Sequence, residues 1–179
     1  MLTRPVTGGV SVQLTELPAL ASLAGIEPLA KVTPPKTSLH LGDLPLVSNL
    51  TALTGLVSID ELRLAGMSGV TSLADLGTLE TVGGLYIGDC FDEDPYDEGG
   101  MDGLTSLAGL NSLVNVERLG FADNAQLGSL DGAPMLQNVK EILFLANPML
   151  PQDEIDKFMA QFTEPPAACI GDWGECWCS

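Results

Sequence analysis

Residues 104–124 read LTSLAGLNSLVNVERLGFADN and contain the pattern that repeats along this chain of 179 residues. Within them an apolar residue stands at every third position: Leu104, Leu107, Leu110, Leu113, Val116 and Leu119. A strict spacing of three differs from the period of a long α-helix. It fits 3₁₀ turns and short extended segments, which have about three residues per turn. The stretch therefore predicts a return path of tight turns, followed by a strand that carries Leu119-x-Phe121.

The same pattern recurs with a fixed period. The paired apolar residues of the strands lie 23 residues apart in Leu39-x-Leu41, Leu62-x-Leu64 and Leu85-x-Ile87, and again in Leu119-x-Phe121 and Ile142-x-Phe144. Two steps are longer, by 11 residues before Leu119 and by four residues before Leu39. One repeat cannot bury its own leucines, but stacked repeats bury them against each other. We therefore predict a β-rich right-handed solenoid over residues 10–150, with about six coils of 23 residues, short parallel strands and 3₁₀ turns.

Three segments resemble known repeat families. VERLGFADN (116–124) and KEILFLANP (140–148) resemble the leucine-rich-repeat signature L-x-x-L-x-L-x-x-N, and LETVGGLYI (79–87) is similar to repeats of receptor L-domains and of bacterial secreted or surface proteins. The resemblance implies a ligand-binding architecture in which an Asn after each strand bonds the backbone between coils. Here this Asn column reads Leu17, Leu44, Met67, Cys90, Asn124 and Asn147. We expect the earlier coils to satisfy their inner backbone groups in another way, for example with water.

Both ends depart from the repeat. Residues 1–9 form an extension, and residues 151–179 form a helical cap with a cysteine-rich tail. Within 153–162, four apolar residues have the spacing of one helix face that closes the last coil: Ile155, Phe158, Met159 and Phe162.

The tail holds Cys169, Cys176 and Cys178 within ten residues. We expect Cys169 to be bonded to Cys176 or Cys178, which indicates an oxidising compartment. Zinc is the alternative, but zinc needs four ligands and the lone His40 lies several coils away. Cys90 is expected to be a buried free thiol.

The charge is strongly acidic, with 24 Asp and Glu against 7 Lys and Arg and a net charge of −17. Nucleic acids and anionic lipid surfaces are repelled by such a surface, and basic partners are attracted. No apolar stretch is long enough to span a membrane. The first thirty residues lack a secretory signal, so the chain is a mature form, an excised domain or a cytoplasmic protein. With the cysteines, we favour an extracellular, periplasmic or cell-surface location, and the cytoplasm is the alternative.

Outward-facing strand residues form two columns on the predicted sheet. The first outward column contains Gln13, His40, Arg63, Tyr86, Gly120 and Leu143, and the second contains Thr15, Gly42, Ala65, Gly88, Ala122 and Leu145. His40, Arg63 and Tyr86 are predicted to bind the ligand, because Arg and Tyr are typical of interface hot spots. The outward Leu143 and Leu145 suggest an alternative in which this face packs on another chain.

An acidic insertion, residues 89–102, lies beside this face. It carries seven acids and no Lys or Arg, together with Tyr96, a further candidate ligand contact. Such oxygen density suits Ca²⁺, with Asp92, Asp94 and Asp97 as candidate ligands, although the EF-hand spacing is absent. The alternatives are a solvated acidic loop and an attractive surface for a basic partner.

The sequence favours recognition over catalysis. There is one histidine and no nucleophile elbow, Walker loop or zinc-protease motif, so no enzymatic activity and no cofactor other than Ca²⁺ is expected. We predict a non-catalytic module that binds a protein or glycan through the sheet face and the acidic insertion. The alternative is a structural subunit of a larger assembly.

Overall fold

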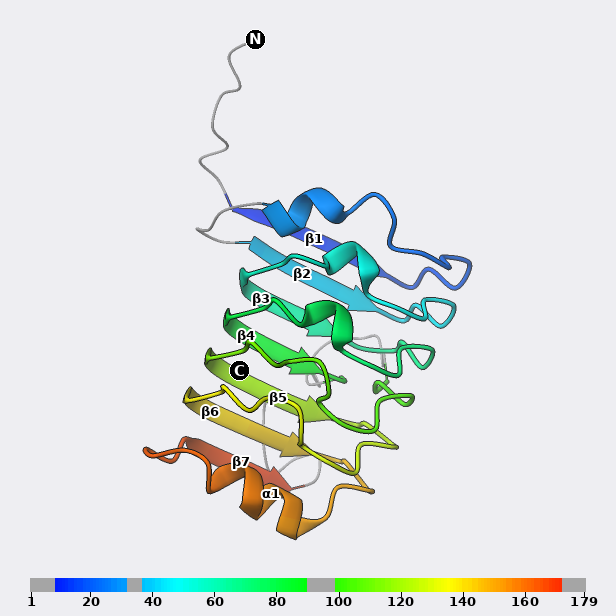
Figure 1. The fold of residues 1–179 in the computed structure, drawn as a ribbon. Coiled ribbons are helices and arrows are strands. Elements are labelled where there is room, and N and C mark those ends of the chain that lie inside the picture. Colours follow the sequence, from blue (N-terminus) through cyan, green and yellow to red (C-terminus); the bar gives the residue numbers. More distant parts are fainter. Residues whose placement is uncertain (1–8, 32–36, 90–98, 172–179) are drawn as a thin grey trace.

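The computed structural model describes residues 9–31, 37–89 and 99–171. These form a single sheet of seven parallel strands that lie side by side in chain order (Figure 1). The strands are β1 (Val10–Thr15), β2 (Thr37–Gly42), β3 (Ser58–Leu64), β4 (Thr81–Ile87), β5 (Asn115–Ala122), β6 (Asn138–Leu145) and β7 (Ala167–Gly171). The helices are few and short: η1 (Glu27–Lys31), η2 (Thr51–Leu53), η3 (Ala74–Leu76) and α1 (Gln152–Met159). None of the described helices is long and apolar enough to cross a membrane.

The strand register follows the repeat in the sequence. Val12 pairs with Leu39, Leu39 with Leu62, and the ladder continues through Leu85, Leu119 and Ile142. The predicted period, including its two longer steps, is therefore confirmed as the register of six neighbouring strands.

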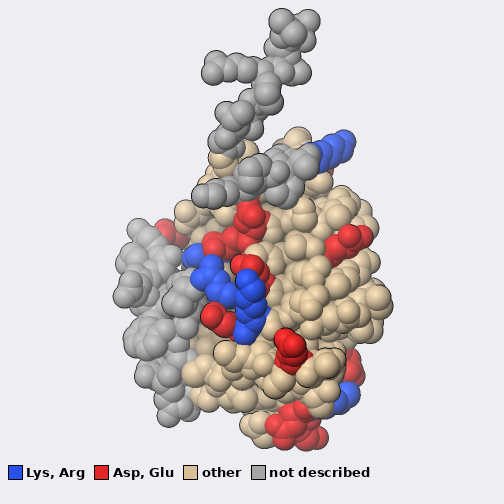
Figure 2. Space-filling model, turned by 90° about the vertical axis from the view of Figure 1, so that its left-hand side faces the viewer, with Lys and Arg blue, Asp and Glu red and all other residues tan. Residues whose placement is uncertain are grey.

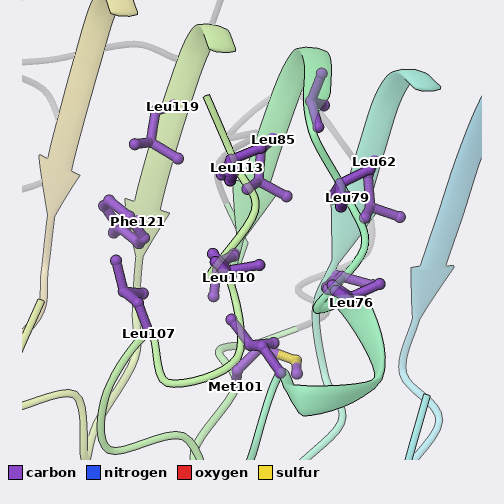
Figure 3. Close-up of a cluster of buried hydrophobic side chains, with 14 of the residues drawn as sticks. Leu62, Leu76, Leu79, Leu85, Met101, Leu107, Leu110, Leu113, Leu119 and Phe121 are labelled. Atoms are coloured by element: carbon purple, nitrogen blue, oxygen red, sulfur yellow. The ribbon is translucent and has the colours of Figure 1, made fainter. Parts of the chain in front are cut away.

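The core lies between the sheet and the return paths. Leucines of the strands, such as Leu62, Leu85 and Leu119, face leucines of the return paths (Figure 3). Leu73, Leu107 and Leu130, which occupy equivalent positions of three return paths, are buried, with 0%, 1% and 3% of each residue exposed. One continuous apolar core therefore runs along the stack, as stacked repeats require.

Within the described residues, the predicted 3₁₀ turns occur as helices only in the first three return paths, at η1, η2 and η3. Later return paths keep i to i+3 hydrogen bonds, for example from Leu110 N to Leu107 O at 3.2 Å. They are interrupted by Gly109 and Gly132, which have φ of 119° and 129°. This backbone conformation is outside the 3₁₀ region and is open mainly to glycine, so the turns there do not join into a helix.

The Asn column differs from its predicted composition at one position. In every repeat the residue of this column accepts, through its carbonyl, the N–H three residues later; this holds for Leu44, Met67, Asn124 and Asn147. In the fourth repeat Met101 O accepts the N–H of Leu104 at 2.8 Å, so Met101 occupies the place predicted for Cys90. The prediction was wrong because the insertion lies before this position, and Cys90 itself lies outside the described residues.

Two amides of the Asn column bridge the repeats as the resemblance implies. Asn124 Nδ2 donates to Ile87 O at 2.9 Å, and Asn147 Nδ2 donates to Phe121 O at 2.8 Å. In earlier repeats backbone groups bond directly between neighbouring strands, since Gly88 N donates to Leu64 O at 2.7 Å. There a backbone N–H bonds the carbonyl that an Asn amide bonds in the later repeats.

The C-terminal end closes the core as predicted. Helix α1 lies against the last repeat and buries Ile155 and Phe158, and Phe162 is buried just beyond it (Figure 1). The ring of Phe158 meets Phe121 and Phe144 edge-on, with centroids 6.4 Å and 6.3 Å apart. The helix ends at Met159, earlier than the predicted Phe162. The sequence did not predict β7, which joins the sheet where a cysteine-rich tail was expected.

Candidate recognition surface

The first outward column exists as predicted, and β7 extends it. Gln13, His40, Arg63, Tyr86, Gly120 and Leu143 pair in succession, and Leu143 pairs in turn with Cys169. The residues from Gln13 to Leu143 each lie between two residues that belong to the main core or pack against it, so this column lies on the other face of the sheet. The predicted columns are therefore real features of the fold.

Part of this outer face is buried, which the sequence did not reveal. Tyr86, Ala122, Leu143 and Leu145 form a second apolar cluster, with Ala146 and Cys169 packed against it. Tyr86 is only 3% exposed, Leu143 8% and Leu145 0%. Tyr86 therefore does not offer a ring face to a ligand. Leu143 and Leu145 are not the exposed apolar patch that suggested assembly.

Arg63 is held between two neighbours at the exposed border of this cluster. Its guanidinium carbon lies 5.7 Å from the centroid of the Tyr86 ring. Its Nε donates to Glu61 Oε1 at 2.7 Å, and both side chains are about a quarter exposed. Gly84 leaves room for the ring, because a Cβ there would lie 2.7 Å from Cε2 of Tyr86. The cation–π contact and the ion pair together fix the direction of the guanidinium.

Further charges surround Arg63 on neighbouring strands. In the sheet register Arg118 lies opposite Gly84, and Glu141 lies opposite Arg118. Lys140 donates to Glu117 at 2.6 Å beside them. Figure 2 looks onto the side of the molecule where the strands start, and there it shows basic side chains gathered near the middle with acidic side chains around them. His40 pairs with Arg63 and is half-buried. The surface thus combines both charges within an acidic protein.

The acidic insertion is described only at its ends, Asp89 and residues 99–102. Gly99 O accepts the N–H of Gly66 at 3.1 Å, which ties the end of the insertion to the turn after β3. Asp92, Asp94, Tyr96 and Asp97 lie outside the described residues. Among the residues that the structure describes, no group of three or more His, Cys, Asp or Glu could hold a metal ion.

Cys169 is disulfide-bonded. It lies in β7, beside Leu143 of the second apolar cluster. Cys176 and Cys178, its predicted partners, lie outside the described residues, as does Cys90. The disulfide is therefore attached to the last strand of the sheet, next to the buried part of the outer face.

A groove that the sequence analysis missed runs across the starts of β3 to β6. This strand-start groove has a volume of about 900 Å³ and is lined by Ser58, Asp60, Thr81, Gly83, Asn115, Glu117, Gln137, Asn138, Lys140 and Glu164, together with apolar residues of the same strands. The available signal was the polar residue directly before the first apolar residue of each strand, namely Ser58, Thr81, Asn115 and Asn138. Its volume lies in the range of small-molecule sites.

Comparisons with protein-family models, with curated proteins and with solved structures return no match for this chain.

Proposed function

We propose that this chain is a non-catalytic recognition module that binds a protein or glycan ligand through the outer face of its sheet and the acidic insertion. One observation carries this proposal: Arg63 is fixed between Glu61 and the ring of Tyr86 at an exposed border of the outer face. A preordered arginine loses little side-chain entropy on binding, and arginine is enriched in interface hot spots. The buried ring of Tyr86 positions the guanidinium of Arg63 and does not itself contact the ligand.

We also propose that the repeats form a right-handed leucine-rich-repeat solenoid of the L-domain-like type. Its support is the sequential order of parallel strands in a register of 23 residues. Connections between parallel neighbours in one sheet are right-handed in almost all proteins. The inter-repeat amides of Asn124 and Asn147 are a second feature of that family resemblance.

An extracellular, periplasmic or cell-surface location is proposed for the module. The disulfide at Cys169 supports it, because structural disulfides persist in oxidising compartments and are rare in the cytosol. The net charge of −17 favours a protein ligand with a basic surface over any nucleic acid.

The binding face is tested by comparing three proteins as baits in a native extract: the unchanged chain, Arg63→Ala and Lys31→Ala. Lys31 is an exposed cation at the end of η1, in the first return path, and serves as the control. A ligand kept by the unchanged chain and by Lys31→Ala, but lost by Arg63→Ala, supports the proposed face. Equal retention by all three contradicts it. The thermal midpoint of each variant shows whether it is folded.

The acidic insertion is tested separately by calorimetric titration with Ca²⁺. Binding in the micromolar range that is lost on changing Asp92 and Asp94 to Asn supports a calcium site at these two residues. If no heat is observed and a basic ligand instead binds with strong salt dependence, the insertion attracts a basic partner. If neither occurs, the insertion is a solvated loop.

A second candidate function is a structural subunit of an assembly, and the first repeat favours it. Its apolar residues are only partly buried against the core: Val12, Leu14, Leu20, Ile26 and Leu29. An uncovered end of a repeat stack is a surface for another chain. Light scattering after size-exclusion chromatography decides between the recognition module and the structural subunit, since a stable oligomer supports the subunit and a monomer supports the recognition module.

A further inference from the structure

The strand-start groove carries a row of polar side chains, one from each of four neighbouring strands. Asn115 Nδ2 donates to Thr81 Oγ1 at 3.3 Å, and Asn138 Nδ2 donates to Asn115 Oδ1 at 2.7 Å. Ser58 precedes them in the same register. The four residues therefore repeat at the spacing of neighbouring strands, about 4.8 Å.

The hydrogen bonds within this row leave part of its capacity open to a ligand. An amide has two N–H donors and an oxygen with two lone pairs. Among the described residues, none donates a hydrogen bond to Asn138 Oδ1, and Asn115 forms one hydrogen bond to Thr81 and one to Asn138. Asn138 is exposed and Asn115 half-buried, and both line the groove. The side chains of this row therefore offer both hydrogen-bond donors and acceptors to a ligand. The hydrogen bonds from Asn138 to Asn115 and from Asn115 to Thr81 hold the two amides in fixed orientations.

Carboxylates outnumber cations among the residues that line the groove. Asp60, Glu117 and Glu164 line it, against a single cation, Lys140, which is paired with Glu117. Asp60 is fixed by accepting the N–H of Thr37 at 2.6 Å. Between Asp60 and Glu117 the corresponding residue is Gly83, which leaves the groove open at that strand. The hydroxyl groups of a neutral ligand can donate to these carboxylates and accept from the amides.

We propose that the strand-start groove binds a neutral, linear glycan that crosses β3 to β6 with about one sugar ring over each strand. Each ring of an extended β-linked glycan advances by a length close to the strand spacing of about 4.8 Å. An extended peptide advances by about 3.3 Å per residue and falls out of step with the polar row. Arg63 does not line this groove. The groove is therefore a second recognition surface, in addition to the face proposed above.

The test uses neutral β-1,4-linked oligosaccharides of glucose, of N-acetylglucosamine and of mannose, in lengths from two to six rings, titrated by calorimetry. We expect one series to bind, with affinity that rises with length and levels off near four rings, because the groove spans four strands. The double variant Asn115→Ala/Asn138→Ala should weaken that binding by about tenfold or more. Asn111→Ala removes an exposed amide of a return path outside the groove and should leave it unchanged.

Three results overturn the proposal: no series binds, binding is the same in the double variant, or affinity is independent of length. An oligolysine peptide is included because the groove is acidic. If it binds with the same dependence on Asn115 and Asn138 while no sugar does, the occupant is a peptide. The single variant Asn138→Ala replaces the double variant if the latter does not fold. Arg63→Ala should leave sugar binding intact. The proposal of a binding site on the outer face and the proposal of a glycan site in the groove can therefore fail independently of each other.

Discussion

At the scale of single residues, Asn124 links three repeats. It is one of two buried polar residues in the described part of the chain, the other being Thr37. Its Nδ2 donates to Ile87 O at 2.9 Å and to Asn147 Oδ1 at 3.0 Å, and its Oδ1 accepts the N–H of Met101 at 3.0 Å. Buried polar groups are costly unless they are bonded. The amide satisfies backbone groups that the repeat pattern alone leaves without a partner.

Changing Asn124 to Ala should destabilise the protein by about 2–4 kcal/mol, because Met101 N–H and Ile87 O then lose a buried partner. Urea unfolding measures the change as a lower midpoint with an unaltered slope. Asn111→Ala, in an exposed return path, serves as the matched control. A loss as small as that of the control would mean that water replaces the amide.

The core residues could be predicted from the sequence because the spacing of three and the period of 23 fix which side chains face inward. The burial of Tyr86 could not, because both faces of a strand can be covered and the covering of the outer face is not encoded in the repeat. The position of Met101 was missed for a different reason. Counting 23 residues back from Asn124 gives Met101, whereas counting forward from Met67 gives Cys90, and the insertion made the two disagree.

At the scale of elements, α1 is attached to the preceding return path by one carboxylate. Glu154 accepts the hydroxyl of Ser129 at 3.0 Å and the N–H of Leu130 at 3.3 Å. Lys157, one turn on, donates to Asp131 at 2.9 Å. Because α1 covers the end of the apolar core, these contacts hold the cap in place.

The attachment of α1 should weaken in acid. Hydrogen bonds from Ser129 and Leu130, and then Lys157, lower the pKa of Glu154 below its ordinary 4.5. A carboxylate with a lowered folded-state pKa contributes stability above its ordinary pKa and loses it as pH falls through the folded-state pKa. Between about pH 7 and pH 3 the thermal midpoint of the unchanged protein should therefore fall more than that of Glu154→Gln. Asp153→Asn, at an exposed carboxylate in the same turn, should behave like the unchanged protein. Parallel curves for all three would contradict this role.

Strand β7 could not be predicted from the repeat because it lacks the paired apolar residues. Its sequence is Ala-Ala-Cys-Ile-Gly, and Ala168 pairs with Ile142 after an interval that includes α1. It contains no buried residue. Backbone pairing with β6 and the disulfide at Cys169 therefore hold it on the sheet, and side-chain burial contributes little.

Titration of the denatured, unreduced protein with a thiol reagent should find two free thiols, since one disulfide leaves two of four cysteines. Peptide mapping should then identify Cys176 or Cys178 as the partner of Cys169. A link between Cys169 and Cys90 would instead join the tail to the insertion. Four free thiols would remove the support for an oxidising compartment.

At the scale of the whole molecule, several of the acids have a structural role in addition to their contribution to solubility. Asp60 accepts an N–H from the preceding repeat, and Asp75 does the same for Leu50 at 2.9 Å. Glu154 does so at the end of the stack. Some of the carboxylates therefore accept hydrogen bonds between neighbouring repeats, and each of these stabilises the contact between two adjacent repeats.

A stack held by contacts between neighbours should be least stable at its ends. In β1 no residue is buried, and the same holds for η1 and β7, whereas the last four residues of β4 and β5 are all buried. We therefore expect amide hydrogen exchange to be fast in β1, intermediate in β2 and slowest in β3 to β5. Reducing the disulfide should accelerate exchange in β7 and leave β3 to β5 unchanged, because the bond acts only on the last strand. Equal exchange in all seven strands would show instead that the sheet opens as one cooperative unit, in which local contacts do not set local stability.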